Sequence, residues 1–312
     1  MIYKTVDVSK IRTTSLKKRK SKVSIKDFAK ILTKMSSFKE FYRSLPNILK
    51  ASELQYLVDR IIEAKKEKRM IIVMMGAHVI KCGLSPIIID LMKRGVIKAI
   101  ALNGAGIIHD SEVAMIGGTS EDVGVAIEDG SFGMARETAD FINNSINKGF
   151  KEGYGIGRVL GVDLYKSKFP YKDLSILSSG IKYKVPVTCH VAIGTDIIHQ
   201  HPSANGEAIG EGSLIDFRNF IYSVSRLEKG VLVNFGSAVI LPEVFLKAFT
   251  VARNLGHKIR HFTTANFDMI PHYRPYQNIL TRPTSLGGRG ISITGHHEIM
   301  IPLLYRMVID RL

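Results

Sequence analysis

The feature that most constrains the fold of this chain is a run of six consecutive apolar residues at positions 70–75. An uninterrupted apolar run of this length is typical of a strand buried on both faces, as in a parallel sheet. Gly76 ends the run, and a helical segment follows over residues 85–93, with Pro86 at its first turn. A second buried run comes next, at residues 96–102. This order predicts a parallel βαβ unit.

The same alternation resumes later in the chain. Buried strands are predicted over residues 185–193, 230–235 and 259–265, and helices over residues 107–116, 172–183, 214–227, 242–255 and 298–310. About five strands thus alternate with helices in 312 residues, of which 45% are apolar, enough for a large core. The pattern predicts an α/β fold, a Rossmann-like, mostly parallel sheet with helices on both faces.

The N-terminal part has a different composition. Residues 1–50 contain 14 Lys and Arg against 3 Asp and Glu, and so hold most of the formal net charge of +16. Amphipathic patterns predict short helices over residues 24–34, 38–45 and 51–65. We therefore expect a basic arm with a helical segment, residues 1–68, and a dinucleotide-binding-type α/β domain, residues 69–312. No aromatic residue interleaves with the densest basic run, so a solvated arm is favoured over a nucleic-acid surface.

The compartment follows from cysteine usage and hydropathy. Cys82 and Cys189 are the two cysteines, and no CxxC pair occurs, which excludes a disulfide framework and favours a reducing, cytoplasmic environment. The chain has no apolar run of about 18 residues. Its first residues also lack the apolar segment of a secretory signal. We therefore expect no membrane association.

The middle of the chain is less regular. Ser131 is a favoured capping residue and predicts a helix over residues 132–148. Four glycines follow within residues 152–164. A dinucleotide fingerprint needs a strand before the glycines and a helix that opens among them, and neither is evident. This segment is therefore predicted to be a flexible loop.

Small and polar residues follow each predicted strand. Ligands of open α/β sheets bind outside the carboxyl ends of the strands. Glycine in such turns permits close backbone approach, and a helix N-terminus can bind phosphate, so a nucleotide or dinucleotide site is predicted here. Ordinary turn chemistry, which also favours Gly, Asn and Asp, is the alternative. The turns contain Gly76 to His78, Asn103 to Gly106, Gly194 to Asp196, Gly236 with Ser237, and Asn266 to Asp268.

Four side chains near these turns are candidates for chemistry. His109 lies beside Asp110 and His190 ends a predicted strand, and imidazole titrates near neutral pH. Lys81 lies in a stretch of apolar and small residues. Partial burial there would lower its pKa and favour attack on a carbonyl or imine. The alternatives are hydrogen-bonded structural histidines and a lysine whose ammonium group reaches solvent.

A metal site is a third possibility. His199, His201 and Asp196 could offer two imidazoles and a carboxylate to zinc or manganese. Residues two apart face the same side only in an extended segment, however, so no metal is our first expectation. A metal-dependent hydrolase stays open as an alternative.

Several short motifs follow one another along the chain, and their order can be compared with that of a known family. They are NGAGIIHD from Asn103, a segment that ends in Thr195-Asp196, VLVNFGSAVILPEVFLKAF from Val231, FTTANFD ending at Asp268, and TRPTSLGG from Thr281. In this order they resemble the deoxyhypusine synthase family over about residues 51–304. The resemblance implies a nicotinamide-dinucleotide-binding α/β fold, NAD as cofactor and a homotetramer. The residues that it would place against the dinucleotide are Ala77, Asn103, Gly104, Ala105, Asp196, Gly236, Ser237 and Asp268.

The family's imine-forming lysine has no counterpart in the motif that carries it. The family has Trp-Gly-Lys, whereas this chain has no tryptophan and has Gly287-Gly288-Arg289 in the nearest matching position. Arginine stays protonated and is a poor imine former. The resemblance therefore implies an NAD-binding enzyme that oxidises an amine or similar small substrate, such as a polyamine, with or without group transfer, rather than deoxyhypusine synthesis. A non-catalytic dinucleotide-binding or scaffold protein is the alternative.

Overall fold

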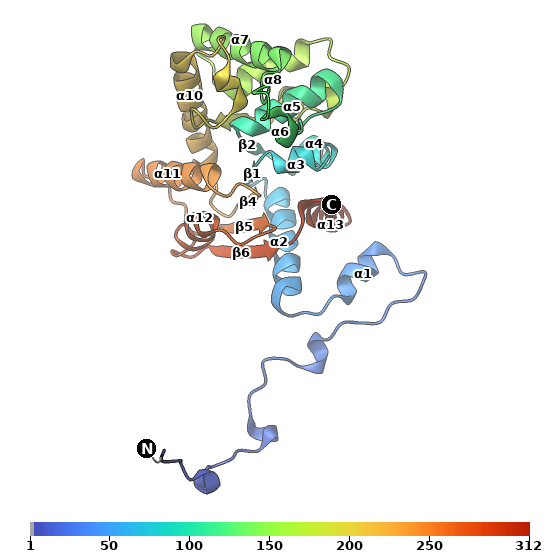
Figure 1. The fold of residues 1–312 in the computed structure, drawn as a ribbon. Helices are drawn as coiled ribbons and strands as arrows, with labels where there is room; N and C mark the ends of the chain where they lie inside the picture. The colour runs from blue at the N-terminus through green and yellow to red at the C-terminus, as the bar shows by residue number, and fades with distance from the viewer. Residues whose placement is uncertain (1–2) are drawn as a thin grey trace. The chain divides into compact units, whose positions relative to one another are not determined.

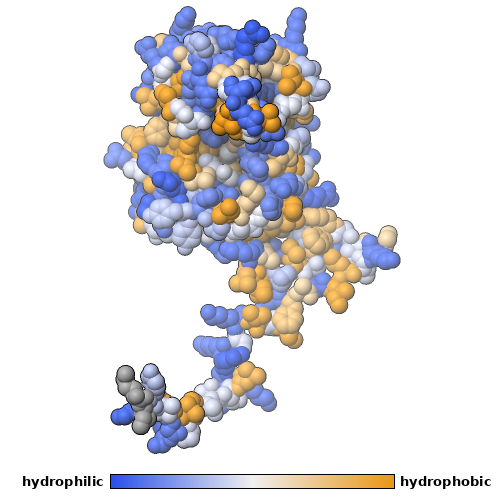
Figure 2. Space-filling model, in the orientation of Figure 1, coloured by the Kyte–Doolittle hydropathy of each residue, from blue (hydrophilic) through white to orange (hydrophobic). Residues whose placement is uncertain are grey.

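The computed structural model describes residues 3–312, and its contacts divide the chain after Ser52 (Figure 1). The smaller unit contains one helix, α1 (Phe38–Ser44), and short 3₁₀ turns at Val8–Lys10, Leu16–Lys18 and Ile25–Asp27. Apolar side chains along it are exposed, Ile31 and Met35 among them. Figure 2 shows hydrophobic residues on the surface of this unit. The helix expected over residues 24–34 is therefore wrong, because no packed face compensates the cost of helix nucleation.

The larger unit is built on a six-stranded sheet in which every neighbouring pair of strands is parallel. The strand order is β3-β2-β1-β4-β5-β6, the order of the dinucleotide-binding Rossmann fold. The predicted α/β fold with a parallel sheet is confirmed. The strands are β1 (Ile71–Met75), β2 (Ala99–Asn103), β3 (Val187–His190), β4 (Val231–Phe235), β5 (Thr263–Asp268) and β6 (Arg289–Thr294).

Helices cover both faces of this sheet, as expected. Ile72 and Met74 of β1 join the core beneath α10 (Gly206–Ser225) and α11 (Ile240–Asn254). Ile71 and Val73 face the opposite side, where residues of α2 (Leu49–Lys66), α4 (Ser85–Lys93) and α13 (His297–Ile309) meet. Alternate residues of one strand thus supply two cores, which explains why the run at residues 70–75 is apolar throughout.

The remaining helices lie toward the β2 end of the sheet, except α12, which lies near β5 and β6 (Figure 1). They are α3 (His78–Lys81), α5 (Gly104–Ile116), α6 (Val123–Ala126), α7 (Arg136–Glu152), α8 (Ile156–Lys166), α9 (Ile176–Tyr183) and α12 (Tyr273–Pro275). Shorter turns lie at Lys172–Leu174 and Ile197–Gln200, and a π-helical turn lies at Tyr276–Thr281. The division after Ser52 lies within the first turns of α2. The domain boundary expected at residue 68 stays a prediction.

The helix expected over residues 132–148 is found as α7, but it begins at Arg136 and Ser131 does not cap it. The loop expected over residues 152–164 is wrong, because this segment contains α8. The glycines of α8 permit close packing rather than flexibility. A Cβ atom at Gly157 would lie 2.0 Å from the carbonyl oxygen of Val187, and one at Gly161 would lie 2.9 Å from that of Leu177.

Strand β6 was not predicted, and β5 begins four residues later than expected. The first two residues of β6 are exposed, so its sequence lacks the continuous apolar run of a central strand. Because β5 extends to Asp268, this aspartate is the last residue of a strand and not part of a following turn.

Candidate functional site at the carboxyl edge of the sheet

The strand order reverses between β1 and β4, and this is where doubly wound folds bind their ligands. The turns after these two strands touch: a Cβ atom at Gly76 would lie 3.0 Å from the carbonyl oxygen of Gly236. Gly236 has a φ of +66°, and a Cβ atom there would lie 2.4 Å from the ring of His297. Glycine is thus required at Gly236, where the chain passes beneath a buried imidazole.

Asp196 lies over the start of α5, at the end of β2. A Cβ atom at Gly104 would lie 1.9 Å from Asp196 Oδ2, so the carboxylate fills the space that a larger residue would take. Burial raises the pKa of Asp196 to about 6, although hydrogen bonds from Thr195 and from the Ala105 backbone oppose the shift. Asp196 Oδ2 is buried and has no hydrogen-bond partner among the described residues. Asn103 caps the same helix by accepting from the Gly106 N–H at 3.0 Å.

A second group lies at the ends of β4, β5 and β6. His297 Nε2 lies 3.2 Å from the carbonyl oxygen of Phe267, which can only accept, so the neutral ring carries its proton on Nε2. Its Nδ1 is buried without a hydrogen-bond partner among residues 3–312. Asp268 Oδ2 likewise has no hydrogen bond there, although His272 Nε2 lies 3.9 Å away. The ring of His78 lies 5.6 Å from that of His297. His297 Nδ1 and Asp268 Oδ2 are therefore acceptors to which a ligand could donate hydrogen bonds.

His109 takes part in a hydrogen-bonded chain on α5. Its Nδ1 lies 2.6 Å from the hydroxyl oxygen of Thr119, which donates its only hydrogen to Glu112. Nδ1 must therefore donate to Thr119, which leaves the lone pair of the neutral ring on Nε2. Thr138 donates to the other oxygen of Glu112 at 3.1 Å. A base whose second nitrogen is oriented by a further group is an arrangement typical of general-base catalysis.

The structure brings Lys81 close enough to His109 to affect its titration. Burial lowers the pKa of His109, the charge of Glu112 raises it, and the charge of Lys81 lowers it. Lys81 itself is exposed, on the four-residue helix α3. The burial on which we based imine formation by Lys81 is therefore not found, and the role that its position supports is electrostatic.

Asp110 and His190, two further catalytic candidates, lie inside the protein. Asp110 caps α9 by accepting from the Ser175 hydroxyl at 2.6 Å and from the N–H groups of Ile176 and Leu177 at 2.7 and 3.1 Å. His190 bonds Thr188 at 2.9 Å and packs edge-on against Phe220, and burial lowers its pKa to about 3. Both side chains are buried and hydrogen-bonded within the protein, so we leave them out of the proposed site.

Replacing Asp110 with alanine is expected to destabilise the fold by about 2–4 kcal/mol, because two buried backbone N–H groups and the Ser175 hydroxyl lose their acceptor. Asparagine keeps one acceptor oxygen but places its NH₂ group against a backbone N–H group, so it should recover only part of this loss. Urea unfolding of both variants measures the difference. Equal stability of wild type and Asp110→Ala would contradict this role.

The histidines considered for a metal bind backbone groups instead. His199 Nδ1 accepts from the N–H groups of Gly194 and Asp196 at 3.1 and 3.3 Å, and His201 Nε2 lies 2.8 Å from the carbonyl oxygen of Gly133. Within residues 3–312, no group of three or more His, Cys, Asp or Glu side chains could hold a metal ion. The structure thus does not assemble the set His199, His201 and Asp196.

The remaining predicted contacts all lie at this edge. Ala77 directly precedes α3, and Ala105 lies in the first turn of α5. The Ser237 hydroxyl accepts from the Leu241 N–H at 3.2 Å and so caps α11. The edge therefore unites Ala77, Asn103, Gly104, Ala105, Asp196, Gly236, Ser237 and Asp268.

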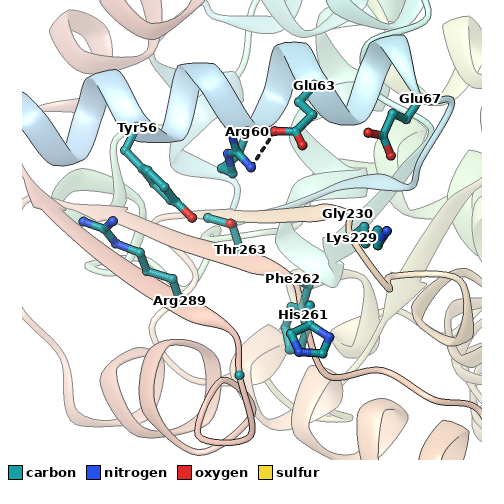
Figure 3. Close-up of a pocket in the computed structure, with 11 residues that line it drawn as sticks. Tyr56, Arg60, Glu63, Glu67, Lys229, Gly230, His261, Phe262, Thr263 and Arg289 are labelled. Carbon is teal, nitrogen blue, oxygen red and sulfur yellow. Dashed lines mark ion pairs between the residues drawn. The ribbon is translucent and has the colours of Figure 1, made fainter.

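Arg289 lies at the opposite, amino edge, because it pairs in register with Thr263 at the start of β5. Figure 3 shows it beside a 280 Å³ cavity between α2 and the first residues of β4, β5 and β6. Its guanidinium group lies 4.0 Å from the centre of the Tyr56 ring. The nearest counterpart of the family's lysine is thus remote from the carboxyl edge.

Two residues of the site were not predicted from the sequence. Thr119 lies ten residues beyond His109 in an irregular segment, and no local pattern marks it. His297 follows β6, and the rule that places ligands at strand ends would have found it if that edge strand had been predicted.

No family model matches the chain, and no curated protein matches it. Solved structures do match its fold. A conserved candidate LOR/SDH protein from Methanococcus maripaludis superposes with a TM-score of 0.55 at 17% identity, over 94% of this chain and 75% of that one. A candidate deoxyhypusine synthase from Entamoeba histolytica gives 0.51 at 12% identity, over 89% and 94%.

The protein AgrE, in a ternary complex with ornithine and NAD⁺, gives a TM-score of 0.50 at 14% identity, over 83% of this chain. This chain spans about a third of AgrE, and of the cyanobacterial arginine dihydrolase ArgZ. At these identities the matches establish the fold class, an α/β fold of LOR/SDH-like and deoxyhypusine synthase-like type. Within the part of the chain that the structure describes, no helix is long and apolar enough to cross a membrane.

Proposed function

We propose that this protein is an enzyme that binds NAD at the carboxyl edge of the sheet and oxidises an amine or similar small substrate. The observation that carries the proposal is Asp196, whose buried carboxylate lies at the end of β2 with one oxygen that accepts no hydrogen bond from residues 3–312. An acidic side chain at this position of a Rossmann fold accepts hydrogen bonds from a ribose of the dinucleotide. Here the loop after β3 supplies it.

The acceptors at this edge fit a ligand rich in hydroxyl and amide donors. Asp196 and Asp268 each have a buried oxygen without a hydrogen bond among the described residues, and ribose hydroxyls and the nicotinamide amide can donate to such atoms. Gly104 and Gly236 let the Asp196 carboxylate and the His297 ring lie close against the backbone at this edge. The carboxylate over α5 would repel a phosphate there. We therefore assign Asp196, Gly104, Ala105 and Asn103 to a ribose, and Ala77, Gly236, Ser237 and Asp268 to the rest of the dinucleotide.

His109 is the group that we propose to remove a proton. Bound NAD⁺ would supply the hydride acceptor for oxidation of a carbon that bears an amine or hydroxyl group. Nε2 of His109 has the free lone pair, and its hydrogen bond to Thr119 orients the ring. His109 is five residues beyond Gly104 on α5, about 7.5 Å along the helix axis. The base is thus held on the same rigid helix whose start lies against the Asp196 carboxylate.

The first test is binding. Thermal unfolding with 1 mM NAD is expected to shift to higher temperature, since a ligand at about 100 times its Kd adds about 2.7 kcal/mol to stability. NADP should shift it less, because its 2′-phosphate would meet the Asp196 carboxylate. Formation of reduced dinucleotide with ornithine, spermidine or related amines then separates an enzyme from a non-catalytic binding protein. The absence of any shift with NAD would refute the proposal.

Replacing Asp196 with asparagine is expected to weaken NAD binding by about 10–100-fold, the value of a hydrogen bond to a charged group. The free protein should become more stable at pH 7, because the variant no longer buries a charge whose pKa is raised to about 6. In the wild type, NAD should bind less tightly below pH 6, where the carboxyl group is protonated. Calorimetric titration of both proteins with NAD at pH 5 and pH 8 measures the two effects on affinity. Thermal unfolding without NAD measures the effect on stability.

The matched control is Asp173→Asn, which removes an exposed aspartate paired with Lys182. It should leave NAD affinity unchanged. Loss of affinity in Asp196→Asn together with loss of stability would indicate a folding defect instead of a missing ribose contact.

A further inference from the structure

A cavity of 750 Å³ opens at the amino edge of the sheet, at the end opposite to the proposed dinucleotide site. It lies beneath the starts of β1, β2 and β3, and helices α2, α9 and α10 end around it. Its lining includes the cationic side chains Lys68, Lys98, Lys184 and Arg226 and the aromatic rings of Tyr183 and Tyr222. The volume is in the range of small-molecule sites.

These four cations have no carboxylate partner within residues 3–312. Glu228 also lines the cavity, but its carboxylate accepts from the N–H groups of Arg260 and His261 at 2.6 and 3.0 Å and pairs with the His261 ring. Arg69, a fifth cation at the rim, pairs with Glu67 at 3.2 Å. Five cationic side chains thus line the cavity against the single carboxylate of Glu228, and the lining keeps a net positive charge.

Lys98 shows the effect of this arrangement. It directly precedes β2 and is half-buried. Burial lowers its pKa, and the charges of Arg226 and Lys68 lower it further, with no acidic group acting in the other direction. A lysine held among like charges is an unfavourable arrangement that a bound anion would relieve.

The negative ends of helix dipoles explain only part of the clustering of cations around this cavity. Lys68 and Lys184 lie just beyond the ends of α2 and α9 with left-handed φ values of +55° and +57°, and Arg226 ends α10. A helix C-terminus presents about half a negative charge, which favours cations there. Three such partial charges do not balance four full cations. Glycine is also the usual residue in the left-handed position beyond a helix, so lysine at both places incurs a backbone cost.

We infer that this cavity binds a small anion with two or more phosphate groups. Lysine ammonium groups act as point charges and suit phosphate, whereas planar carboxylates favour paired arginines. The four cations in the lining exceed the charge of one phosphate monoester at neutral pH, even when the Glu228 carboxylate is counted against them. The site is separate from the carboxyl edge, so a ligand there would bind without displacing NAD.

Calorimetric titration of the full-length protein with inorganic tripolyphosphate at 150 mM salt tests the inference. We expect saturable one-to-one binding, and clearly weaker binding of citrate, a polycarboxylate of comparable size. Lys98→Gln and Arg226→Gln should each weaken tripolyphosphate binding by at least about tenfold, since each removes a charge-assisted contact. Lys151→Gln removes an exposed charge on α7 and should have no effect.

Two further controls exclude other anion sites. A variant with glutamine at the five basic positions of residues 17–22 removes the densest charge of the N-terminal arm, and it should still bind tripolyphosphate. Saturation with NAD, or the Asp196→Asn change, should also leave this binding intact. The inference is overturned if no saturable binding occurs, if the arm variant abolishes it, or if both Lys98→Gln and Arg226→Gln bind like wild type while folded by thermal unfolding.

Discussion

Replacing His109 with glutamine is expected to lower the rate of NAD reduction by about 10²–10⁴-fold, the usual contribution of a general base. Glutamine keeps a polar group at this position but cannot accept the proton. NAD affinity should stay unchanged, because the ribose contact that we propose belongs to Asp196. Steady-state rates with an oxidisable amine, together with calorimetric titration of NAD, measure the two quantities separately. Normal turnover by the variant would eliminate His109 as the base.

The hydrogen-bonded chain behind His109 gives a second variant for the same proposal. Thr119→Val keeps the shape of the side chain but removes the hydroxyl group between His109 and Glu112. The ring would then lose the contact that fixes its proton on Nδ1, and turnover should fall by a smaller factor than in His109→Gln. Thr119→Ser retains the hydroxyl and should restore most of the rate. Identical rates in the valine and serine variants would show that the chain has no role in catalysis.

The pH dependence of kcat and of the KM for NAD should separate the protonation of His109 from that of Asp196. Burial lowers the pKa of His109 below 6.5, so the base form persists into mildly acidic solution and kcat should fall only below that pH. The pKa of Asp196 is raised to about 6, so its protonation should appear in the KM for NAD. Lys81→Gln removes a charge that lowers the pKa of His109, and the limb in kcat should move to higher pH. Complete loss of turnover in Lys81→Gln would instead support imine formation by this lysine.

The strands that carry the site were predictable because burial on both faces leaves a strong pattern. Every residue of β1 and β4 is buried, and these runs were recognised within a residue of their ends. β6 is an edge strand with exposed residues and Gly290, and this composition resembles a loop. The positions of the turns, and hence the dinucleotide edge, follow from the strands. The roles of the side chains within those turns do not.

Those roles depend on partners that are distant in the sequence. Asp110 is adjacent to His109, and an acid–base pair was a natural hypothesis, yet its carboxylate caps a helix that begins 66 residues later. The glycines of α8 were mistaken for flexibility for the same reason. A glycine required by contact with a distant backbone and a glycine in a mobile loop look alike in one sequence.

The carboxylate of Asp216 in α10 connects α8 to β3, a contact that the sequence does not predict. Its replacement by alanine is expected to have the largest effect on stability. One carboxylate oxygen accepts from the N–H groups of both Gly157 in α8 and Cys189 in β3, each at 2.8 Å. The other oxygen would lie only 2.0 Å from a Cβ atom placed on Gly155, so this position requires glycine. Alanine would leave two buried donors unsatisfied, so we expect a loss of about 2–6 kcal/mol in the free energy of unfolding.

Asparagine at this position separates the hydrogen bonds from the charge. Its amide oxygen can accept from both N–H groups, whereas the buried carboxylate is disfavoured, since burial raises the pKa of Asp216 to about 7. A raised pKa means that the folded state holds the proton more tightly than the unfolded state. The wild-type contribution therefore declines as the pH rises from about 4 to about 7 and is constant above that range. Asp216→Asn should remove this decline, so that its stability relative to wild type is higher at pH 8 than at pH 5. Urea unfolding at the two pH values measures it, and a difference of the opposite sign would show that the carboxylate is stabilised by its charge.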